Sequence, residues 1–258
     1  MIIDTHIHLD DERYVEDFDA MMARAREAGV EAFVIPGAHP GTLERAVEIA
    51  EANDDVYFAV GVHPYDMEAF ESVDFARFAS HPKCVAIGEC GLDYYRLDGS
   101  EEEKRSEKER QAHVFREQIR FAKEVRKPLI VHIRDASHDA KMLLLEEGAA
   151  EVGGVLHCYN ADEELLSLAK EGFYFGIGGV VTFQNAKKLI HVLPKIPTEK
   201  LVIETDGPYL TPHPHRGTRN ESAYTRYIAD KMADLLGMSA DEIEELTTLN
   251  AKKLFTFG

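Results

Sequence analysis

The chain has 258 residues, of which 45% are hydrophobic and 29% charged, and this composition is ordinary for a globular protein. Its 29 Lys and Arg against 47 Asp and Glu give a net charge of −18, which excludes a protein that holds long nucleic acid through a basic surface. A phosphate-bearing substrate is still compatible with this charge, because bound metal cations can supply positive charge locally.

The sequence shows no segment of the kind that targeting or membrane insertion needs. No apolar run approaches the length of a membrane span, and we find no signal core or cleavage site. Cys84, Cys90 and Cys158 lack CxxC spacing, so we expect reduced thiols and no disulfide framework. The expectation is therefore a cytoplasmic protein without a membrane partner.

Eight short apolar runs alternate with amphipathic stretches along the chain. In residues 112–125, apolar side chains recur at three- and four-residue spacing, which predicts a helix with one buried face. The mixed charged run at 98–110 predicts a solvated loop and helix start. The expected strands are 2–5, 32–35, 57–60, 85–87, 129–131, 154–156, 173–176 and 201–203, and the clearest helices are 18–28, 42–52, 112–125, 223–236 and 241–254.

Strands that alternate with helices imply parallel βαβ units, and eight such units in about 250 residues are the size of a (β/α)₈ barrel. A doubly wound open sheet is the competing architecture. No Gly-x-Gly-x-x-Gly follows the first strand, which weakens the dinucleotide-binding version of that alternative. We find no linker, so residues 1–258 are expected to form a single α/β domain, a barrel followed by two extra C-terminal helices.

The first expected strand leads into "DTHIHL", residues 4–9. His6 and His8 are two positions apart, so in an extended strand their side chains point to the same face. Two imidazoles on one face, with no Lys or Arg between them, are typical of metal ligands. A strand end that carries two hydrogen-bonded histidines is the simpler alternative.

Comparable side chains follow four other expected strands. In a barrel the C-terminal strand ends ring one mouth, where active sites lie, so these groups would converge there. Burying several ionisable groups without a counter-charge is costly, and one or two cations would remove that cost. With His6 and His8, the candidate ligands are Glu89, His132, His157 and Asp206.

Motifs along nearly the whole chain resemble those of the TatD family of metal-dependent hydrolases. They are "DTHIHLD", "GVHPYD", "IGECGLDYYR", "PLIVHIRDA", "VLHCY", "IETDGPYLTP", "HRGTRNES" and "TTLNAKKLF". The resemblance implies a distorted (β/α)₈ TIM barrel of the amidohydrolase type and a binuclear metal centre of divalent ions, with Zn, Mg, Mn or Ni as candidates. It also implies a monomeric deoxyribonuclease that acts on single-stranded DNA or on a small phosphoester.

The resemblance also implies roles for individual residues. The first metal would be held by His6, His8 and Asp206, the second by His132 and His157, and Glu89 would bridge both. Catalysis would also involve His63 and Arg134, and the substrate site would include His63, Arg134, Glu204, His213 and Arg216. The sequence departs from the family at Gly207, where Ala or Ser is common, and in "HCYN", where "HCF" followed by a small polar residue and glycine is more usual.

This residue set suits phosphodiester hydrolysis, because two divalent ions can activate a water and neutralise the attacked group. Asp206 is the candidate general base, with a role as ligand alone as the alternative. Arg134 could bind a phosphate oxygen or form an ion pair with Asp135. His63 could donate a proton to the leaving oxygen or orient a ligand.

Two other functions are compatible with the sequence. A metal-dependent amide or ester hydrolase, including one that deacylates D-aminoacyl-tRNA, could use the same centre, because a barrel does not determine the reaction. A protein that retains the metals only for structure or binding is the third alternative. Tyr94 and Tyr95 could stack on a base, but we expect them to pack in the core.

Overall fold

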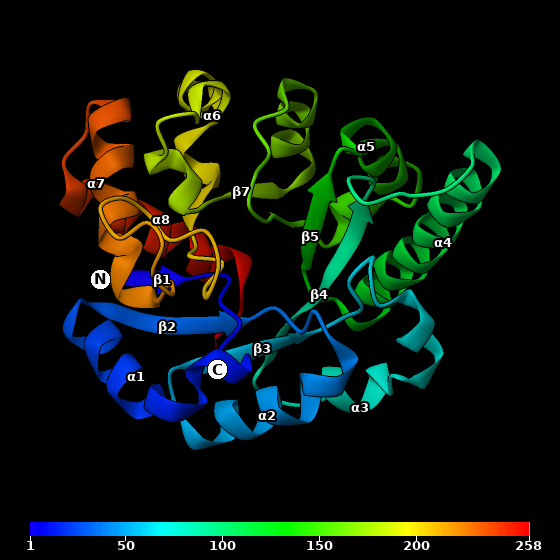
Figure 1. Ribbon diagram of the computed structural model, residues 1–258, viewed down its shortest axis with the longest axis horizontal. Helices are drawn as coiled ribbons and strands as arrows, with labels where there is room; N and C mark the ends of the chain where they lie inside the picture. Colours follow the sequence, from blue (N-terminus) through cyan, green and yellow to red (C-terminus); the bar gives the residue numbers. More distant parts are fainter. Residues whose placement is uncertain (258) are drawn as a thin grey trace.

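The computed structural model describes residues 1–257 and contains an eight-stranded sheet whose strands follow one another in chain order (Figure 1). Every pair of neighbouring strands is parallel. The strands are β1 (Ile2–Asp4), β2 (Val30–Ile35), β3 (Val56–Val60), β4 (Cys84–Asp93), β5 (Leu129–Arg134), β6 (Gly154–Leu156), β7 (Phe173–Ile177) and β8 (Leu201–Ile203).

The first and last strands meet, so the sheet curls into a barrel. The backbone N–H of Thr5 donates to the carbonyl of Ile203 at 3.1 Å, and a parallel bridge joins Ile7 to Gly207. This seam is shorter than a regular ladder, and it is formed largely by residues beyond the ends of β1 and β8. The predicted distorted (β/α)₈ barrel is confirmed.

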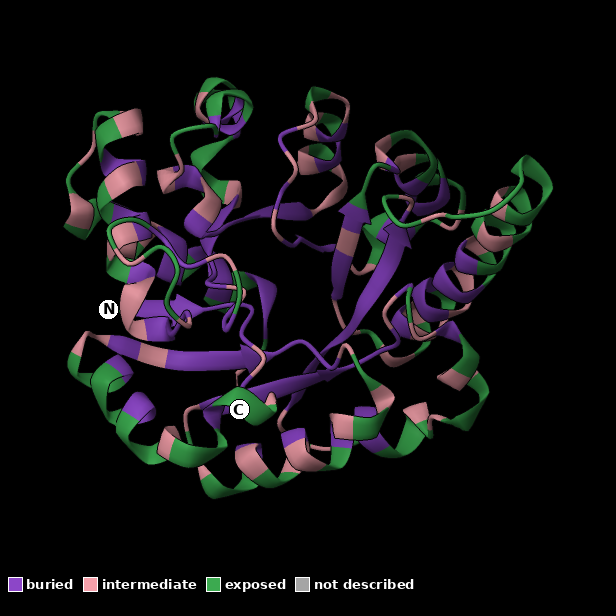
Figure 2. Cartoon of the chain, in the orientation of Figure 1, coloured by how far each residue is buried: buried purple, intermediate pink, exposed green. Residues whose placement is uncertain are grey.

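Helices surround the sheet and expose their outer faces, whereas the strands are almost entirely buried (Figure 2). A 3₁₀ helix at Glu163–Glu171 takes the position between β6 and β7. No described helix is both apolar and long enough to cross a bilayer. The helices are α1 (Phe18–Glu27), α2 (Leu43–Ala52), α3 (Phe75–Ala79), α4 (Glu101–Val125), α5 (Ser137–Glu146), α6 (Lys187–Val192), α7 (Thr225–Leu236) and α8 (Ala240–Leu254).

The charged run at 98–110 is a short exposed loop followed by a helix start, as predicted, but the helix is longer than its apolar pattern indicated. Helix α4 begins at Glu101, eleven residues before the predicted start at Ala112. The side chain of Ser100 accepts from the N–H of Glu103, and the Glu103 carboxylate accepts from the N–H of Ser100. This capping box, followed by three acidic residues in the first turn, stabilises a helix start that apolar periodicity could not reveal. A second capping box, formed by Ser239 and Glu242, begins α8.

Helix α8 covers the end of the barrel where the strands begin. The Thr248 hydroxyl donates to the carbonyl of Met1 at 2.7 Å, and the N-terminal ammonium lies 3.1 Å from Glu244. Phe255, directly after α8, joins a buried cluster with inward-facing strand residues such as Ile3 and Val202. Because this end is closed, side chains at the opposite end of the barrel are the ones that a ligand can reach.

Strand β4 continues to Asp93, six residues beyond its predicted end at Ile87. Its register with β5 shifts between Ile87 and Cys90, where a β-bulge interrupts regular pairing. Bulges change the direction of the side chains beside them. Glu89 lies within this irregular stretch and is buried with 3% of its surface exposed.

Candidate metal centre

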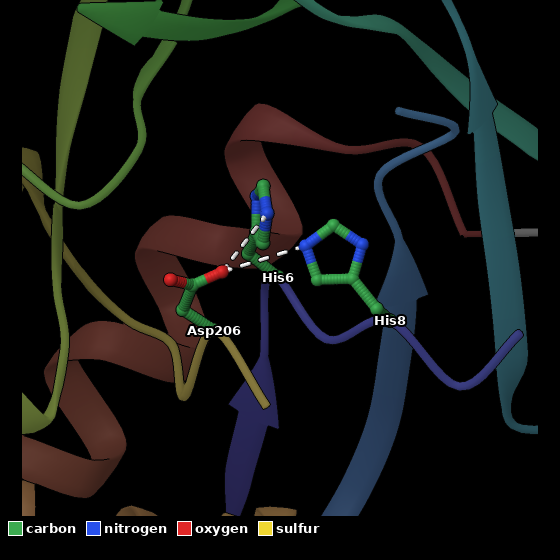
Figure 3. A group of neighbouring side chains, drawn as sticks. All are labelled: His6, His8 and Asp206. Atoms are coloured by element: carbon green, nitrogen blue, oxygen red, sulfur yellow. Dashed lines mark ion pairs between the residues drawn. The ribbon is translucent and has the colours of Figure 1, made fainter. Parts of the chain in front are cut away.

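The segment after β1 and the segment after β8 bring three potential ligands together (Figure 3). Nε2 of His6 lies 3.7 Å and Nε2 of His8 lies 3.4 Å from the same oxygen of Asp206, Oδ1. The backbone fixes this arrangement, because the N–H of Asp206 donates to the carbonyl of His6 at 2.9 Å. Residues two hundred positions apart thus form one compact group of two imidazoles and a carboxylate.

Glu89 connects this group to a second one. Its Oε2 lies 3.4 Å from Nε2 of His6. Its Oε1 lies 2.9 Å from Nδ1 of His132 and 3.2 Å from Nε2 of His157. The two oxygens of one carboxylate therefore face two different sets of imidazoles, which is the arrangement that a carboxylate shared between two cations requires.

The donors in this centre fit a divalent cation. His6 is fully buried, and neither of its ring nitrogens has a hydrogen-bond partner among residues 1–257. Buried polar atoms without partners are rare and costly. Four imidazoles with carboxylate oxygens match the ligands that Zn, Mn and Ni take in proteins.

The electrostatics of the centre also favour positive charge. Burial alone would raise the pKa of Glu89, but the neighbouring His157, His6 and His132 hold it well below its usual range. Burial would lower the pKa of His157, yet Glu89 and Glu204 raise it well above its usual value. The carboxylates thus favour protonation of imidazoles such as that of His157. A bound divalent cation would supply the same positive charge in place of the protons.

Two further carboxylates lie behind the imidazoles. Oδ2 of Asp93 is 3.0 Å from Nε2 of His132, and Oε1 of Glu204 is 3.4 Å from Nδ1 of His157. Such carboxylates fix the ring orientation and tautomer of metal-binding histidines. They leave Nδ1 of His132 and Nε2 of His157 to face Glu89.

Asp93 is not among the residues predicted from sequence, although it lies four residues after Glu89 in the motif "IGECGLDYYR". Glu204 was predicted as a substrate-site residue, and the structure buries it completely, with the backbone N–H of Cys158 donating to it at 2.5 Å. Its contacts favour a role in orienting His157 over contact with a substrate.

All three cysteines are free, as predicted.

His63, after β3, points Nε2 at the centre, 3.7 Å from Oε1 of Glu89. Its Nδ1 accepts the backbone N–H of Tyr65 at 3.1 Å, so the proton of the neutral ring is on Nε2. Burial lowers the pKa of His63 to about 4, which keeps the ring neutral near pH 7. A neutral ring with its proton on Nε2 is a hydrogen-bond donor toward the centre and lacks the lone pair that a ligand needs there.

Arg134, at the end of β5, is exposed beside the centre. Its guanidinium lies 3.7 Å above the ring of Tyr95 and has no ion-pair partner among the described residues, Asp135 included. Tyr95 is 59% exposed, so the prediction that it packs in the core is wrong. The charge of Arg134 is available to an anionic ligand.

The remaining predicted substrate residues, His213 and Arg216, gather around Phe183. The ring of His213 meets Phe183 edge-on at 6.3 Å, and the Arg216 guanidinium lies 4.0 Å above the same ring while donating to the carbonyl of Thr211. Both side chains are exposed. Their described contacts are with the segment that carries Phe183 and with Thr211, and none is with the six candidate ligands.

Replacing Asp93 by Asn is expected to weaken divalent metal binding about 10- to 100-fold, because the carboxylate that orients His132 is lost. Competition titration against a fluorescent chelator would measure the change. Asp98→Asn, an exposed position on the following loop, is the matched control and should bind metal as the wild type does. Equal affinity in the Asp93 and Asp98 variants would exclude this role for Asp93.

Comparisons of the sequence and of the structure with known proteins all find proteins of the TatD type. The family model described as "TatD related DNase" matches residues 3–256. The chain is 45% identical to the "Uncharacterized metal-dependent hydrolase YabD" of Bacillus subtilis (strain 168), over 99% of both chains. It is 35% identical to the "3'-5' ssDNA/RNA exonuclease TatD" of Shigella flexneri serotype 5b, over 98% of both. The crystal structure of YJJV, a TatD homologue from Escherichia coli K12, superposes with a TM-score of 0.85 at 29% identity, covering 98% of this chain and 97% of that one.

Proposed function

Because the chain belongs to the TatD-related DNase family and is a metal-dependent hydrolase, we propose that it cleaves phosphodiester bonds of single-stranded DNA. The observation that carries the proposal is the position of Glu89 between two groups of imidazoles. The name of the Shigella relative, an exonuclease acting on single-stranded DNA and RNA, supports the choice of substrate. The exposed guanidinium of Arg134 is suited to a phosphate oxygen.

In this proposal the centre holds two divalent cations. One would be held by His6, His8 and Asp206 and the other by His132 and His157, and Glu89 would be shared between them. Bound there, the cations supply a water of lowered pKa and positive charge beside the phosphoryl oxygens. The imidazole-rich ligand set favours Zn, Mn or Ni over Mg, although Mg accepts the carboxylate and phosphate oxygens.

The side chains around the cations then handle protons and the substrate. Oδ1 of Asp206 faces His6 and His8, and the other oxygen points away from both imidazoles, where it can accept a proton from the attacking water (Figure 3). The neutral His63 donates a hydrogen bond from its Nε2–H to the leaving oxygen, and the proton that Asp206 takes from the water is available to protonate that oxygen. Arg134 binds a non-bridging phosphate oxygen and so orients the phosphodiester.

The charge of the whole chain limits how the enzyme meets DNA. A net charge of −18 repels a long polyanion beyond the centre, so we infer contact with only a few nucleotides.

The proposal treats residues 1–258 as one catalytic domain that acts as a monomer. Three free cysteines favour a reducing compartment such as the cytoplasm.

Treatment with EDTA is expected to abolish cleavage of end-labelled single-stranded DNA, and added Mn²⁺ or Zn²⁺ should restore it, because both cations are needed for activity. Gel analysis of the products measures the activity. The same preparations should be tested on p-nitrophenyl esters and D-aminoacyl-tRNA. Hydrolysis of those substrates without any cleavage of DNA would contradict the proposal and favour an amide or ester hydrolase.

A further inference from the structure

A cavity of about 540 Å³ opens directly beside the candidate metal centre. His157 and Asp206 form part of its wall on the side of the centre, and the entry to α6 forms part of the opposite wall. The volume lies within the roughly 300–1,000 Å³ that is usual for small-molecule sites. A ligand held at the centre can therefore place one group the size of a small molecule in this cavity.

The walls of the cavity are largely apolar. Ile133, Val180, Leu189 and Leu210 line it, and the buried Leu189 is the apolar residue that α6 contributes. Tyr209 stands at its edge beside His8, with ring centroids 5.9 Å apart. Apolar and aromatic walls of this kind suit the faces of a flat heterocycle.

Some polar groups of the cavity are already engaged in holding its wall. The Asn160 amide donates to Oγ of Ser137 at 3.0 Å and accepts the N–H of Asp162 at 2.9 Å. The hydroxyl of Tyr159 donates to the carbonyl of Asp162 at 2.7 Å. These contacts make the wall rigid and leave those side chains with less capacity to bind a ligand.

Other polar groups are free. The side chains of Asn185 and Lys188 are exposed and form neither a hydrogen bond nor an ion pair with any of residues 1–257. Arg134, also in the wall, has no carboxylate partner. One amide and two positive charges are therefore available at an otherwise apolar cavity.

The other side of the centre has the opposite character. A second cavity there, about 660 Å³, shares Tyr209 with the first and has three acidic side chains in its wall against one arginine. Its charged and imidazole-bearing lining residues are Asp10, Asp11, Glu12, Arg45, His8 and His39. Carboxylates repel the phosphates of a nucleic acid strand. Charge thus directs a strand toward the cavity that carries Arg134 and Lys188.

We propose that the 540 Å³ cavity is a nucleobase subsite, which receives the base of one nucleotide next to the cleaved phosphodiester. This inference rests on the proposed function. The base lies between the apolar walls, Asn185 hydrogen-bonds its edge, and Lys188 and Arg134 bind the flanking phosphates. Binding then depends on the presence of a base as well as on phosphate.

The test compares two ligands that differ only by the base, a deoxynucleoside 5′-monophosphate and deoxyribose 5-phosphate, titrated calorimetrically into the metal-loaded protein. The nucleotide should bind about 10- to 100-fold more tightly, as expected for one stacked base. Leu189→Arg, which fills the cavity, and Asn185→Ala should both reduce this ratio. Lys188→Ala should weaken both ligands equally, and Lys187→Ala, a neighbouring exposed residue outside the cavity wall, should change neither.

A ratio near one in the wild type would overturn the inference, and so would a high ratio that both Leu189→Arg and Asn185→Ala leave intact. Because Asn185 is exposed and without partners, its variant should fold normally and keeps the test decisive if Leu189→Arg does not fold. Hydrolysis of bis(p-nitrophenyl) phosphate, which has no base, separates this inference from the proposed function. Cleavage of that diester with a ratio of one would refute the subsite alone. A high, Asn185-dependent ratio without cleavage of any phosphodiester would refute the proposed function alone.

Discussion

Glu89→Gln is expected to reduce the rate of phosphodiester cleavage at least roughly 1,000-fold, because the variant loses the charge shared by both halves of the centre. The amide has nearly the shape of the carboxylate but only one oxygen. It cannot present an anionic oxygen both to His6 at 3.4 Å and to His132 at 2.9 Å. Steady-state rates at saturating metal, measured beside the wild type, would give the reduction.

The control for this variant is a change of the same kind at an exposed position. Glu109→Gln, at an exposed position of α4, removes one acidic charge from a side chain that forms no described hydrogen bond or ion pair with the candidate ligands. Its rate and metal content should equal those of the wild type. If Glu89→Gln retained more than a tenth of wild-type activity, a bridging role for Glu89 would be untenable.

Asp4→Ala is expected to lower the free energy of unfolding by about 3–5 kcal/mol, because it leaves several buried donors unpaired. Asp4 is fully buried at the end of β1. Its carboxylate accepts the N–H of Thr205 at 2.9 Å, the Thr205 hydroxyl at 2.6 Å and the Ser222 hydroxyl at 2.6 Å. These bonds join β1 to the segment that carries Asp206, and urea denaturation would measure their loss.

Ser222→Ala is the matched comparison, since it removes one of these donors and keeps the carboxylate. Its cost should be near 1 kcal/mol. If Asp4→Ala cost no more than Ser222→Ala, the carboxylate would not be the group that joins the two segments.

The stability of the wild type relative to Asp4→Asn should depend on pH. Burial raises the pKa of Asp4 to about 7, against the opposing effect of its hydrogen bonds from Ser222 and Thr205. A carboxyl group with a raised pKa in the folded state binds more protons folded than unfolded. The wild type should therefore lose stability relative to Asp4→Asn as the pH rises from about 4 to about 7. Unfolding midpoints of both proteins across this range, if parallel, would contradict that assignment.

The centre could be predicted well from sequence because its members occupy equivalent positions. Four of the candidate ligands, His6, His8, His157 and Asp206, follow the ends of strands, and His132 lies in the C-terminal half of β5. A barrel brings such ends together whatever their distance along the chain. In the structure the candidate ligands fall into three overlapping groups, which are His6 with His8 and Asp206, His6 with Glu89 and His157, and Glu89 with His132 and His63.

Three features were not predicted from sequence, and each depends on local backbone structure or tertiary contacts. Asp93 was not predicted because the expected strand ended at Ile87, whereas β4 continues to Asp93. The Glu204 side chain points toward His157 and not toward the mouth of the barrel. The sequence could not predict this direction, because Glu204 follows a strand of only three residues and alternation of side chains does not extend beyond the strand. Helix α4 begins before its predicted start because a capping box stabilises its first turn. Its first three turns have no apolar pattern from which a helix could be predicted.

The most direct test of this account is a crystal structure of the metal-loaded protein with anomalous data collected at the absorption edge of the added metal. We expect two peaks, one among His6, His8 and Asp206 and one between His132 and His157, with an oxygen of Glu89 beside each. Peaks only at other places, or no peak under any metal supplied, would contradict the assignment of these six side chains as the catalytic metal site.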